Sequence, residues 1–248
     1  MITKKTETQK KTKSLMYFIS KKVGMAIAEY GMLSDKDKIL VAVSGGKDSI
    51  TLLKLLKFRQ SFVPIHFDLI AAHIDFGTTT RQSKALATFC KKLKVDYYVR
   101  KSNILKKQSK QERNCFWCSW NRRKLLFQLA DKKGCNKVAL GHHMDDIVET
   151  VLLNLFYQGQ ISAMKPKQEL FEGKITLIRP LAYLEENDIA RFAKASGDFP
   201  YKTCTCKSAI DSKRVVVEKV IKELTRESRH VKKNIFQSVK RIKKDYLL

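Results

Sequence analysis

The sequence contains no stretch that approaches the roughly 20 uninterrupted apolar residues of a membrane-spanning helix. Residues 1–11 begin with basic side chains, and no apolar signal-peptide core follows them. No internal repeat and no low-complexity linker divides the 248 residues. These absences favour a cytoplasmic protein that has a single catalytic core and makes no use of a membrane.

Acidic residues are scarce: 24 Asp and Glu stand against 50 Lys and Arg, which gives a formal net charge of +26. Such an excess of positive charge attracts polyanions, and nucleic acid is the natural partner. A lysine-rich solvated surface without any partner would give the same composition. Basic residues cluster over 1–13 and 226–244, and this clustering favours the nucleic-acid interpretation.

Cysteine is too sparse for a disulfide framework: the sequence has 6, and 4 of them form two close pairs. The pairs are Cys115-Phe-Trp-Cys118 and Cys204-Thr-Cys206. Paired thiolates in a reducing compartment suit metal or redox chemistry. The single cysteines are different, and we expect buried structural thiols at Cys90 and Cys135.

Apolar runs of strand length alternate with segments of helical periodicity over 39–195. This alternation predicts an α/β fold, a Rossmann-like parallel sheet with helices on both faces. We expect strands at 39–43, 69–74, 95–100, 137–141 and 175–178, and helices at 49–58, 81–93, 117–131, 146–157 and 185–195.

Three segments are expected along the chain. Residues 1–14 form a disordered basic tail. Residues 15–206 form the catalytic domain, which opens with an amphipathic helix over 15–32. Residues 207–248 form a short, basic, helical C-terminal module. In a parallel sheet of this kind, ligands bind beyond the carboxyl ends of the strands.

Residues 44–49 read Ser-Gly-Gly-Lys-Asp-Ser and lie between an expected strand and an expected helix. The glycines let backbone N–H groups approach an anion, and the helix N-terminus adds partial positive charge. Lys47 can neutralise a phosphate oxygen. A Walker A loop would need glycine in place of Val41 and Ser or Thr in place of Asp48, so a different ATP chemistry is indicated. The alternative interpretation is a Gly-Gly turn that only caps a helix.

The segment 141–150 carries a second group of polar residues after a strand. It puts Asp145 and Asp146 at a helix N-terminus near the expected phosphates, where paired carboxylates can hold Mg²⁺. The alternative is that one aspartate caps the helix and the other favours its dipole. Of His142 and His143, one is expected to meet the substrate and the other to pack as a neutral side chain.

The hexapeptide 44–49 is similar to the defining motif of the PP-loop ATP pyrophosphatases. Further motifs make the sequence resemble the tRNA 2-thiocytidine synthetases, the TtcA family of tRNA-cytidine 2-sulfurtransferases, from about residue 15 to 225. These motifs are Cys115-x-x-Cys118 followed by Arg122-Arg123, Gly141-His-His-x-Asp-Asp146, Asn154-Leu-Phe-Tyr157, Ile178-Arg-Pro-Leu-Ala-Tyr183 and a later cysteine pair.

The resemblance implies an ATP-dependent tRNA thiolation. ATP is cleaved between its α and β phosphates, O2 of a cytidine in the anticodon loop (position 32 type) is adenylated, and sulfur displaces AMP to give 2-thiocytidine. A [4Fe–4S] cluster is implied on Cys115, Cys118 and Cys204, with Cys206 in reserve, and its free iron takes up a hydrosulfide. A cysteine desulfurase or a persulfide carrier would donate the sulfur.

The resemblance also implies roles for individual residues. Arg122 or Arg123 would stabilise the adenylate or grip a tRNA phosphate, whereas an exposed helix face is the alternative. Phe116, Trp117 and Trp120 would stack a flipped base or pack in the core. The implied catalytic residues are Lys47, Asp145 and Arg122; those for ATP are Ser44, Gly45, Gly46, Lys47, Asp48, Ser49, Asp75 and His142; those for Mg²⁺ are Asp145 and Asp146.

Other interpretations stay open. Four thiolates from Cys115, Cys118, Cys204 and Cys206 would hold a structural zinc instead of a cluster. A PP-loop enzyme that thiolates a uridine, or one that forms lysidine, shares the phosphate loop. A zinc-stabilised RNA-binding module would bind ATP without turning it over. A homodimer is compatible with the sequence, which does not determine the oligomeric state.

Overall fold

The computed structural model describes residues 2–76, 80–102, 115–197 and 213–246. In this part of the chain, six strands form one sheet in the order β3-β2-β1-β4-β6-β5. Five of them are parallel, and β5 pairs antiparallel with β6. The strands are β1 (Asp37–Ala42), β2 (Phe67–Asp75), β3 (Asp96–Lys101), β4 (Lys137–Ala139), β5 (Lys167–Leu170) and β6 (Ile175–Ile178). The predicted Rossmann-like α/β fold is confirmed.

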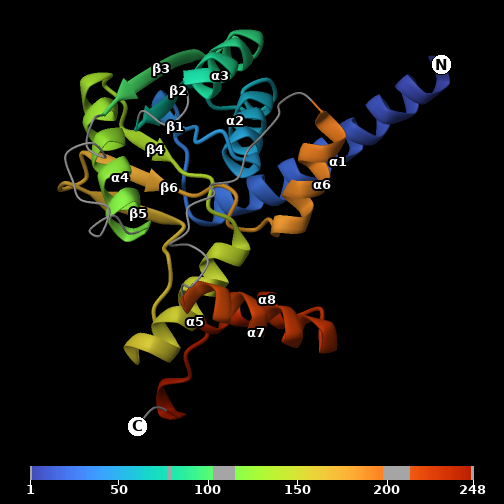
Figure 1. Ribbon diagram of the computed structural model, residues 1–248. Helices are drawn as coiled ribbons and strands as arrows, with labels where there is room; N and C mark the ends of the chain where they lie inside the picture. Colours follow the sequence, from blue (N-terminus) through green and yellow to red (C-terminus); the bar gives the residue numbers. More distant parts are fainter. Residues whose placement is uncertain (1, 77–79, 103–114, 198–212, 247–248) are drawn as a thin grey trace.

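Helices cover both faces of the sheet because successive strand residues point to opposite sides (Figure 1). Ile39 and Val41 of β1 pack against one layer of helices, whereas Leu40 packs against the other layer. The first layer is α1 (Ile2–Glu29), α2 (Lys47–Arg59), α3 (Thr80–Lys92) and α6 (Glu186–Ser196), and the second is α4 (Cys115–Lys132).

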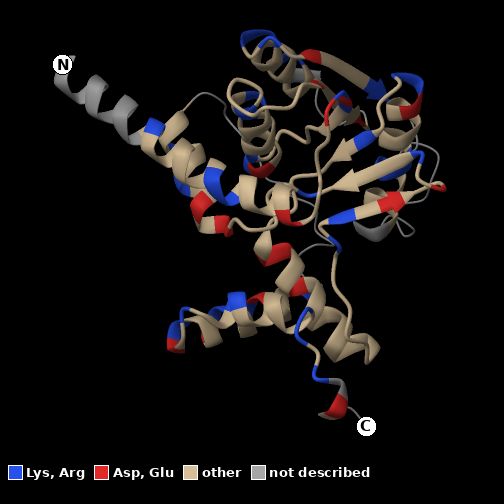
Figure 2. Cartoon of the chain, turned by 180° about the vertical axis from the view of Figure 1, so that it is seen from behind, with Lys and Arg blue, Asp and Glu red and all other residues tan. Residues whose placement is uncertain are grey.

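A third apolar cluster lies outside these two layers and joins α5 (Met144–Gln158) to α7 (Lys213–Glu227) and α8 (Val231–Ser238). Val148 of α5, Val217 of α7 and Phe236 of α8 are among its buried members. A short 3-10 helix, η4 (Lys244–Tyr246), follows. Lys and Arg occur on the helices around the sheet and on these C-terminal helices alike (Figure 2). None of the helices described here is long and apolar enough to cross a membrane.

Two local features differ from the sequence analysis. Residues 2–14, expected to be disordered, belong to α1. No glycine or proline precedes Gly24, so nothing in the sequence stops the helix from extending backward, and Thr12 Oγ1 donates to the carbonyl of Ala195 at 3.0 Å. The edge strand β5 was not expected, because its sequence Lys-Gln-Glu-Leu lacks an apolar alternation and only its pairing with β6 makes it a strand.

Candidate active site

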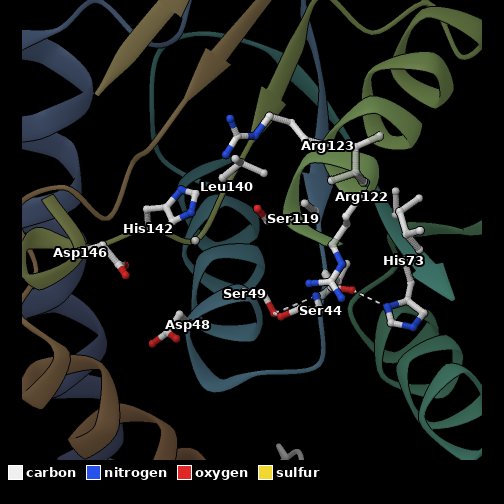
Figure 3. A pocket seen from close by; sticks show the side chains of 16 residues that line it. Ser44, Asp48, Ser49, His73, Ser119, Arg122, Arg123, Leu140, His142 and Asp146 are labelled. Carbon is white, nitrogen blue, oxygen red and sulfur yellow. Dashed lines mark hydrogen bonds between the residues drawn. The ribbon is translucent and has the colours of Figure 1, made fainter. Parts of the chain in front are cut away.

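The chain order of the strands reverses between β1 and β4, and a cavity of about 290 Å³ opens near their carboxyl ends (Figure 3). A crevice of this kind is where open α/β sheets bind ligands. The cavity is lined by the end of β1 and the loop after it, by 72–74 of β2, by one face of α4, and by the segment that leads from β4 into α5.

The 44–49 loop is held by its own serines. Ser49 Oγ accepts from the backbone N–H of Ser44 at 3.2 Å and donates to the carbonyl of Gly46 at 3.0 Å. Gly45 has φ +86°, and a Cβ built on it would lie 2.0 Å from Nε2 of Gln82, whose amide donates to Ser44 O. Only glycine therefore fits at this position. The N-terminus of α2 begins directly after Gly46 and points its backbone donors toward the cavity end of the loop.

The loop after β4 packs directly on the start of α2. A Cβ at Gly141 would lie 3.1 Å from the backbone carbon of Asp48 and 3.1 Å from the backbone nitrogen of Ser49. The absence of that Cβ brings the N-terminus of α5 close to the N-terminus of α2. Ser44, Asp48 and Ser49 consequently share one cavity with Gly141, His142 and Asp146.

The Lys47 ammonium lies between two carboxylates. Its Nζ is 2.8 Å from Glu186 Oε1 and 3.2 Å from Asp48 Oδ1. Burial opposes the charge, but these carboxylates outweigh it and raise the pKa of Lys47. Asp48 lines the cavity, whereas Lys47 and Glu186 lie outside the residues that line it.

The pKa values of His142 and His143 are shifted in opposite directions. Burial, with the nearby Arg179 and Arg123, lowers the pKa of His142 to about 4, so its imidazole is neutral at pH 7. For His143, burial opposes protonation, but Asp145, Asp146 and Asp48 outweigh it and raise the pKa.

The expected carboxylate pair does not face one site. Asp145 Oδ2 accepts from the backbone N–H of Glu186 at 2.8 Å, and its Oδ1 is 2.5 Å from Nζ of Lys232. Asp146 lines the cavity, and its Oδ2 accepts from the backbone N–H of His143 at 3.0 Å. Asp145 thus faces α6 and α8, and Asp146 combines a capping position with a place at the cavity.

Asp146 and Asp145 stay ionised because of His143 and, after it, cations from the C-terminal helices. Burial raises the pKa of each carboxyl. For Asp145, the hydrogen bonds of His143 and Lys232 outweigh burial. For Asp146, the charge of His143, with Arg214 among others, outweighs it. The pKa of both carboxyls is therefore lowered. Arg214 also pairs with Glu149, one turn farther along α5.

Arginines of α4 form the opposite wall. Arg122 and Arg123 both line the cavity, and Figure 3 shows Arg123 extending toward His142. The Arg122 guanidinium also stacks over the ring of Phe76, 5.4 Å from its centre. Arg122 is exposed and Arg123 is partly buried, so a role toward the adenylate or a tRNA phosphate and an exposed helix face both stay open for these arginines.

Three residues near the cavity were missed from the sequence. His73 and Ser119 line it, and Arg179 lies behind His142. His73 Nδ1 lies 2.8 Å from the carbonyl of Val43, and burial lowers its pKa. A histidine inside the otherwise apolar run 69–74 was the signal that could have identified His73. The expected Asp75 ends that strand and is buried, but it does not line the cavity.

The structure describes only some of the cysteines that were predicted to bind a metal or cluster. Cys118 lies in the first turn of α4, which begins at Cys115, and it is partly buried. Cys204 and Cys206 lie outside the described residues. Within the described residues, no group of three or more His, Cys, Asp or Glu could hold a metal ion. The prediction that Cys90 and Cys135 are buried thiols is confirmed.

Of the three aromatics near the cysteines, Trp120 is 52% exposed and carries Lys124 Nζ 5.4 Å from its ring centre. It is not a core residue. Trp117 is partly buried, and its carbonyl accepts from Asn121 at 2.9 Å. The side chain of Phe116 lies outside the described part.

Known proteins resemble this chain over most of its length. Residues 13–227 match the family model described as a PP-loop domain. A tRNA-cytidine(32) 2-sulfurtransferase from Geobacter sulfurreducens is 37% identical over 236 residues, which are 93% of this chain and 91% of that protein. The protein of the same name from Azotobacter vinelandii is 39% identical over 210 residues, 83% of this chain and 76% of the relative.

The chain belongs to the tRNA-cytidine(32) 2-sulfurtransferase family, whose members contain a PP-loop domain. The resemblance stated from the motifs is confirmed, and so is the expectation of an enzyme, since the family's members are named as sulfurtransferases. A solved U34-tRNA thiolase, NcsA from Methanococcus maripaludis with its [4Fe-4S] cluster, superposes with a TM-score of 0.74. The match covers 92% of this chain and 78% of NcsA at 20% identity, and it confirms the fold of this family member.

Proposed function

We propose that the chain is an ATP-dependent tRNA thiolase that converts a cytidine of the anticodon loop, of the position 32 type, into 2-thiocytidine. The observation that carries the proposal is the family membership at 37% identity over 93% of the chain, with the name tRNA-cytidine(32) 2-sulfurtransferase. The cavity between the 44–49 loop and α4 supports it, because a phosphate-type loop and two arginines face the same space. A cytoplasmic location remains a prediction.

In this proposal, ATP lies with its β and γ phosphates on the backbone donors after Gly45 and Gly46. Lys47 leaves Glu186 and neutralises the departing pyrophosphate. Ser44 and Ser49 keep the loop in its shape. Arg122, or Arg123 beside it, neutralises charge at the α-phosphorus while the cytidine O2 attacks, so that the arginines compensate the charge that develops there.

Magnesium fits the cavity better on Asp146 and Asp48 than on the expected pair. Both of these residues line the cavity, where Asp48 is paired with Lys47 and Asp146 with Arg214. Asp145 does not line the cavity, and its oxygens face Glu186 and Lys232. A magnesium ion would there neutralise pyrophosphate charge. We assign Asp145 the role of holding α5 against α6 and α8.

The described residues fit an iron–sulfur cluster only through the start of α4. Positions 115 and 118 lie one turn before Ser119 and Arg122, two of the cavity-lining positions of that helix, and this spacing supports a cluster at the start of α4. Three thiolates, with Cys204 as the third, would leave one iron for a hydrosulfide. A cysteine desulfurase or persulfide carrier would supply that sulfur.

Nucleoside mass analysis of tRNA from cells with and without the gene tests the proposal. We expect loss of 2-thiocytidine alone when the gene is absent. Unchanged 2-thiocytidine with loss of another thiolated base or of lysidine would overturn the choice of cytidine in favour of a sister enzyme. The absence of AMP and pyrophosphate release with bulk tRNA would overturn the enzyme and favour a zinc-stabilised RNA-binding module.

Metal content separates the cluster from the zinc alternative. Protein purified without oxygen should contain iron and acid-labile sulfide and show charge-transfer absorption that disappears in Cys118→Ser. One zinc per chain without sulfide would instead indicate a structural site with four thiolates.

A further inference from the structure

His142 has one nitrogen with a partner and one without. Its Nδ1 lies 3.3 Å from Nε of Arg179. Among the described residues, no hydrogen bond to Nε2 is formed. His142 lines the cavity and Arg179 does not, so the nitrogen without a partner is the one available to a ligand (Figure 3).

The guanidinium of Arg179 is fixed in place. The residue directly follows β6 and is 3% exposed. Its Nη1 donates to the carbonyl of Lys165, and its backbone N–H donates to the carbonyl of Pro166 at 2.8 Å. Arg179 therefore reaches His142 from a position that two carbonyl groups hold.

Arginine has N–H donors and no acceptor. A hydrogen bond between Arg179 Nε and His142 Nδ1 therefore requires a lone pair on Nδ1. In the neutral imidazole, the single proton then resides on Nε2. A doubly protonated imidazole would place an N–H against an N–H, and it would add a charge beside Arg179 and Arg123.

The other groups around the ring do not reverse this assignment. Asp146 and His143 of α5 and Arg123 of α4 are the charged or titratable groups that act on it besides Arg179. Asp146 alone favours a second proton, and its oxygens already face the His143 N–H and Arg214. The neutral ring with its proton on Nε2 is the form that these contacts favour.

We propose that Arg179 is a positioning residue that holds His142 in the Nε2–H form, so that His142 donates a hydrogen bond to a substrate oxygen in the cavity. The identity of that oxygen rests on the proposed function: it belongs either to the α-phosphate of ATP or to the carbonyl of the base that is thiolated. His142 accordingly acts as a donor and does not accept the proton of a reacting group.

Nitrogen-15 spectra of the full chain test the tautomer without any activity assay. Long-range ¹H–¹⁵N correlations at pH 7.5 should show a protonated Nε2 and an unprotonated Nδ1 for His142, which His142→Gln identifies by the loss of its signals. Arg179→Met should shift proton occupancy toward Nδ1, and Arg179→Lys, which keeps a cationic donor, should restore the original pattern. A proton on Nδ1 in the unmodified chain, or an unchanged spectrum in Arg179→Met, overturns the proposal.

Two substitutions of His142 test its donor role. The amide of glutamine places an N–H near the position of Nε2, whereas the shorter asparagine reaches only that of Nδ1. We expect tRNA-dependent AMP release to fall by about 10²-fold in His142→Asn and by less than about 10-fold in His142→Gln. Equal losses in the two variants, with both folded by thermal unfolding, would overturn the donor role.

The acceptor is identified by comparing two measurements on His142→Asn. Weaker equilibrium binding of a non-hydrolysable ATP analogue assigns the α-phosphate. Unchanged analogue binding with a lower kcat/KM for tRNA assigns the base carbonyl. If both are unchanged, the donor role is wrong. For the spectra of Arg179→Met, the control is Arg59→Met. This variant also removes a guanidinium, but Arg59 lies at the far end of α2, where it donates to the carbonyl of Ser20.

If the chain modifies another base, the nitrogen-15 results stand and only the acceptor changes. If it releases no AMP at all, the proposed function fails while the tautomer measurement still gives its answer. The two failures are therefore distinguishable.

Discussion

At the scale of single residues, the ammonium of Lys47 is the charge that a phosphate would meet at the start of α2. It is paired with Glu186 and Asp48, and their carboxylates keep it protonated. Lys47→Met should lower tRNA-dependent pyrophosphate release by about 10²-fold to 10³-fold, because it removes the ammonium that would neutralise the leaving group. The measurement is the initial rate of pyrophosphate formation.

Lys57→Met is the matched control for this prediction. Lys57 lies in the last turn of the same helix, where its ammonium donates to Gln60 at 3.0 Å. Its replacement removes the same charge at the opposite end of α2, and we expect an unchanged rate. Equal losses in the two variants would show that the effect comes from net charge and not from the position of Lys47.

The position of the 44–49 loop could be predicted because its six residues are contiguous and its glycine requirement is local. The contacts of His73 and Arg179 could not. His73 meets the carbonyl of Val43 only because β2 lies beside β1, and Arg179 meets His142 only because β6 lies beside β4. A strand order of this kind is set by the whole sheet.

At the scale of elements, the contact between α5 and α7 contains a carboxyl that resists ionisation. Burial, opposed by Arg214, raises the pKa of Glu149 to about 7 from its ordinary 4.5. The native state keeps this proton over a pH range in which the unfolded chain has lost it. The free energy of unfolding therefore falls as the pH rises from about 4.5 to about 7, and it stays low above that range.

Glu149→Gln should remove this fall. Between pH 5 and pH 8, we expect the variant to lose roughly 2 kcal/mol less unfolding free energy than the unmodified chain. Urea unfolding at a series of pH values measures the difference in slope, which does not depend on the absolute loss of the Arg214 pair. Glu223→Gln, on the exposed side of α7, should leave the slope unchanged. If the unfolding free energy of Glu149→Gln fell with pH as steeply as that of the unmodified chain, the raised pKa of Glu149 would be wrong.

Elements were predictable where an apolar pattern marks them. The buried residues of β1, β2 and α2 give runs that sequence periodicity identifies. The pattern fails at β5, where pairing with β6 supplies the structure, and at 2–14, where continuation of a helix does. Asp146 lines the cavity and its sequence neighbour Asp145 faces α6 and α8, and only the packing of these helices separates the two roles.

At the scale of the whole molecule, the charge of +26 favours association with a polyanion. The C-terminal helices carry exposed cations, and α8 contacts Asp145 beside the cavity through Lys232. Replacing Lys233, Arg241 and Lys243 by glutamine should weaken tRNA binding and lower the slope of log affinity against log salt by about 1 for each phosphate that is no longer neutralised. Filter binding at several salt concentrations measures both.

A set with the same loss of charge provides the control. Three lysines are exposed at the end of α3: Lys91, Lys92 and Lys94. The end of α3 leads into the first residue of β3, so these lysines lie at the amino ends of the strands, whereas the cavity lies at the carboxyl ends. Their replacement by glutamine should leave the salt slope unchanged. Identical behaviour of the two triple variants would mean that tRNA responds to total charge and does not contact α8 or the segment that follows it.

Helix α5 belongs to the cavity at its first turn and to the third apolar cluster along the rest of its length. Its carboxylates at the cavity end are held by Arg214 of α7 and Lys232 of α8. The C-terminal helices therefore depend on α5 for their packing and for their ion pairs. A chimaera that takes α7 and α8 from a relative therefore keeps these ion pairs and the third apolar cluster only if α5 is taken with them.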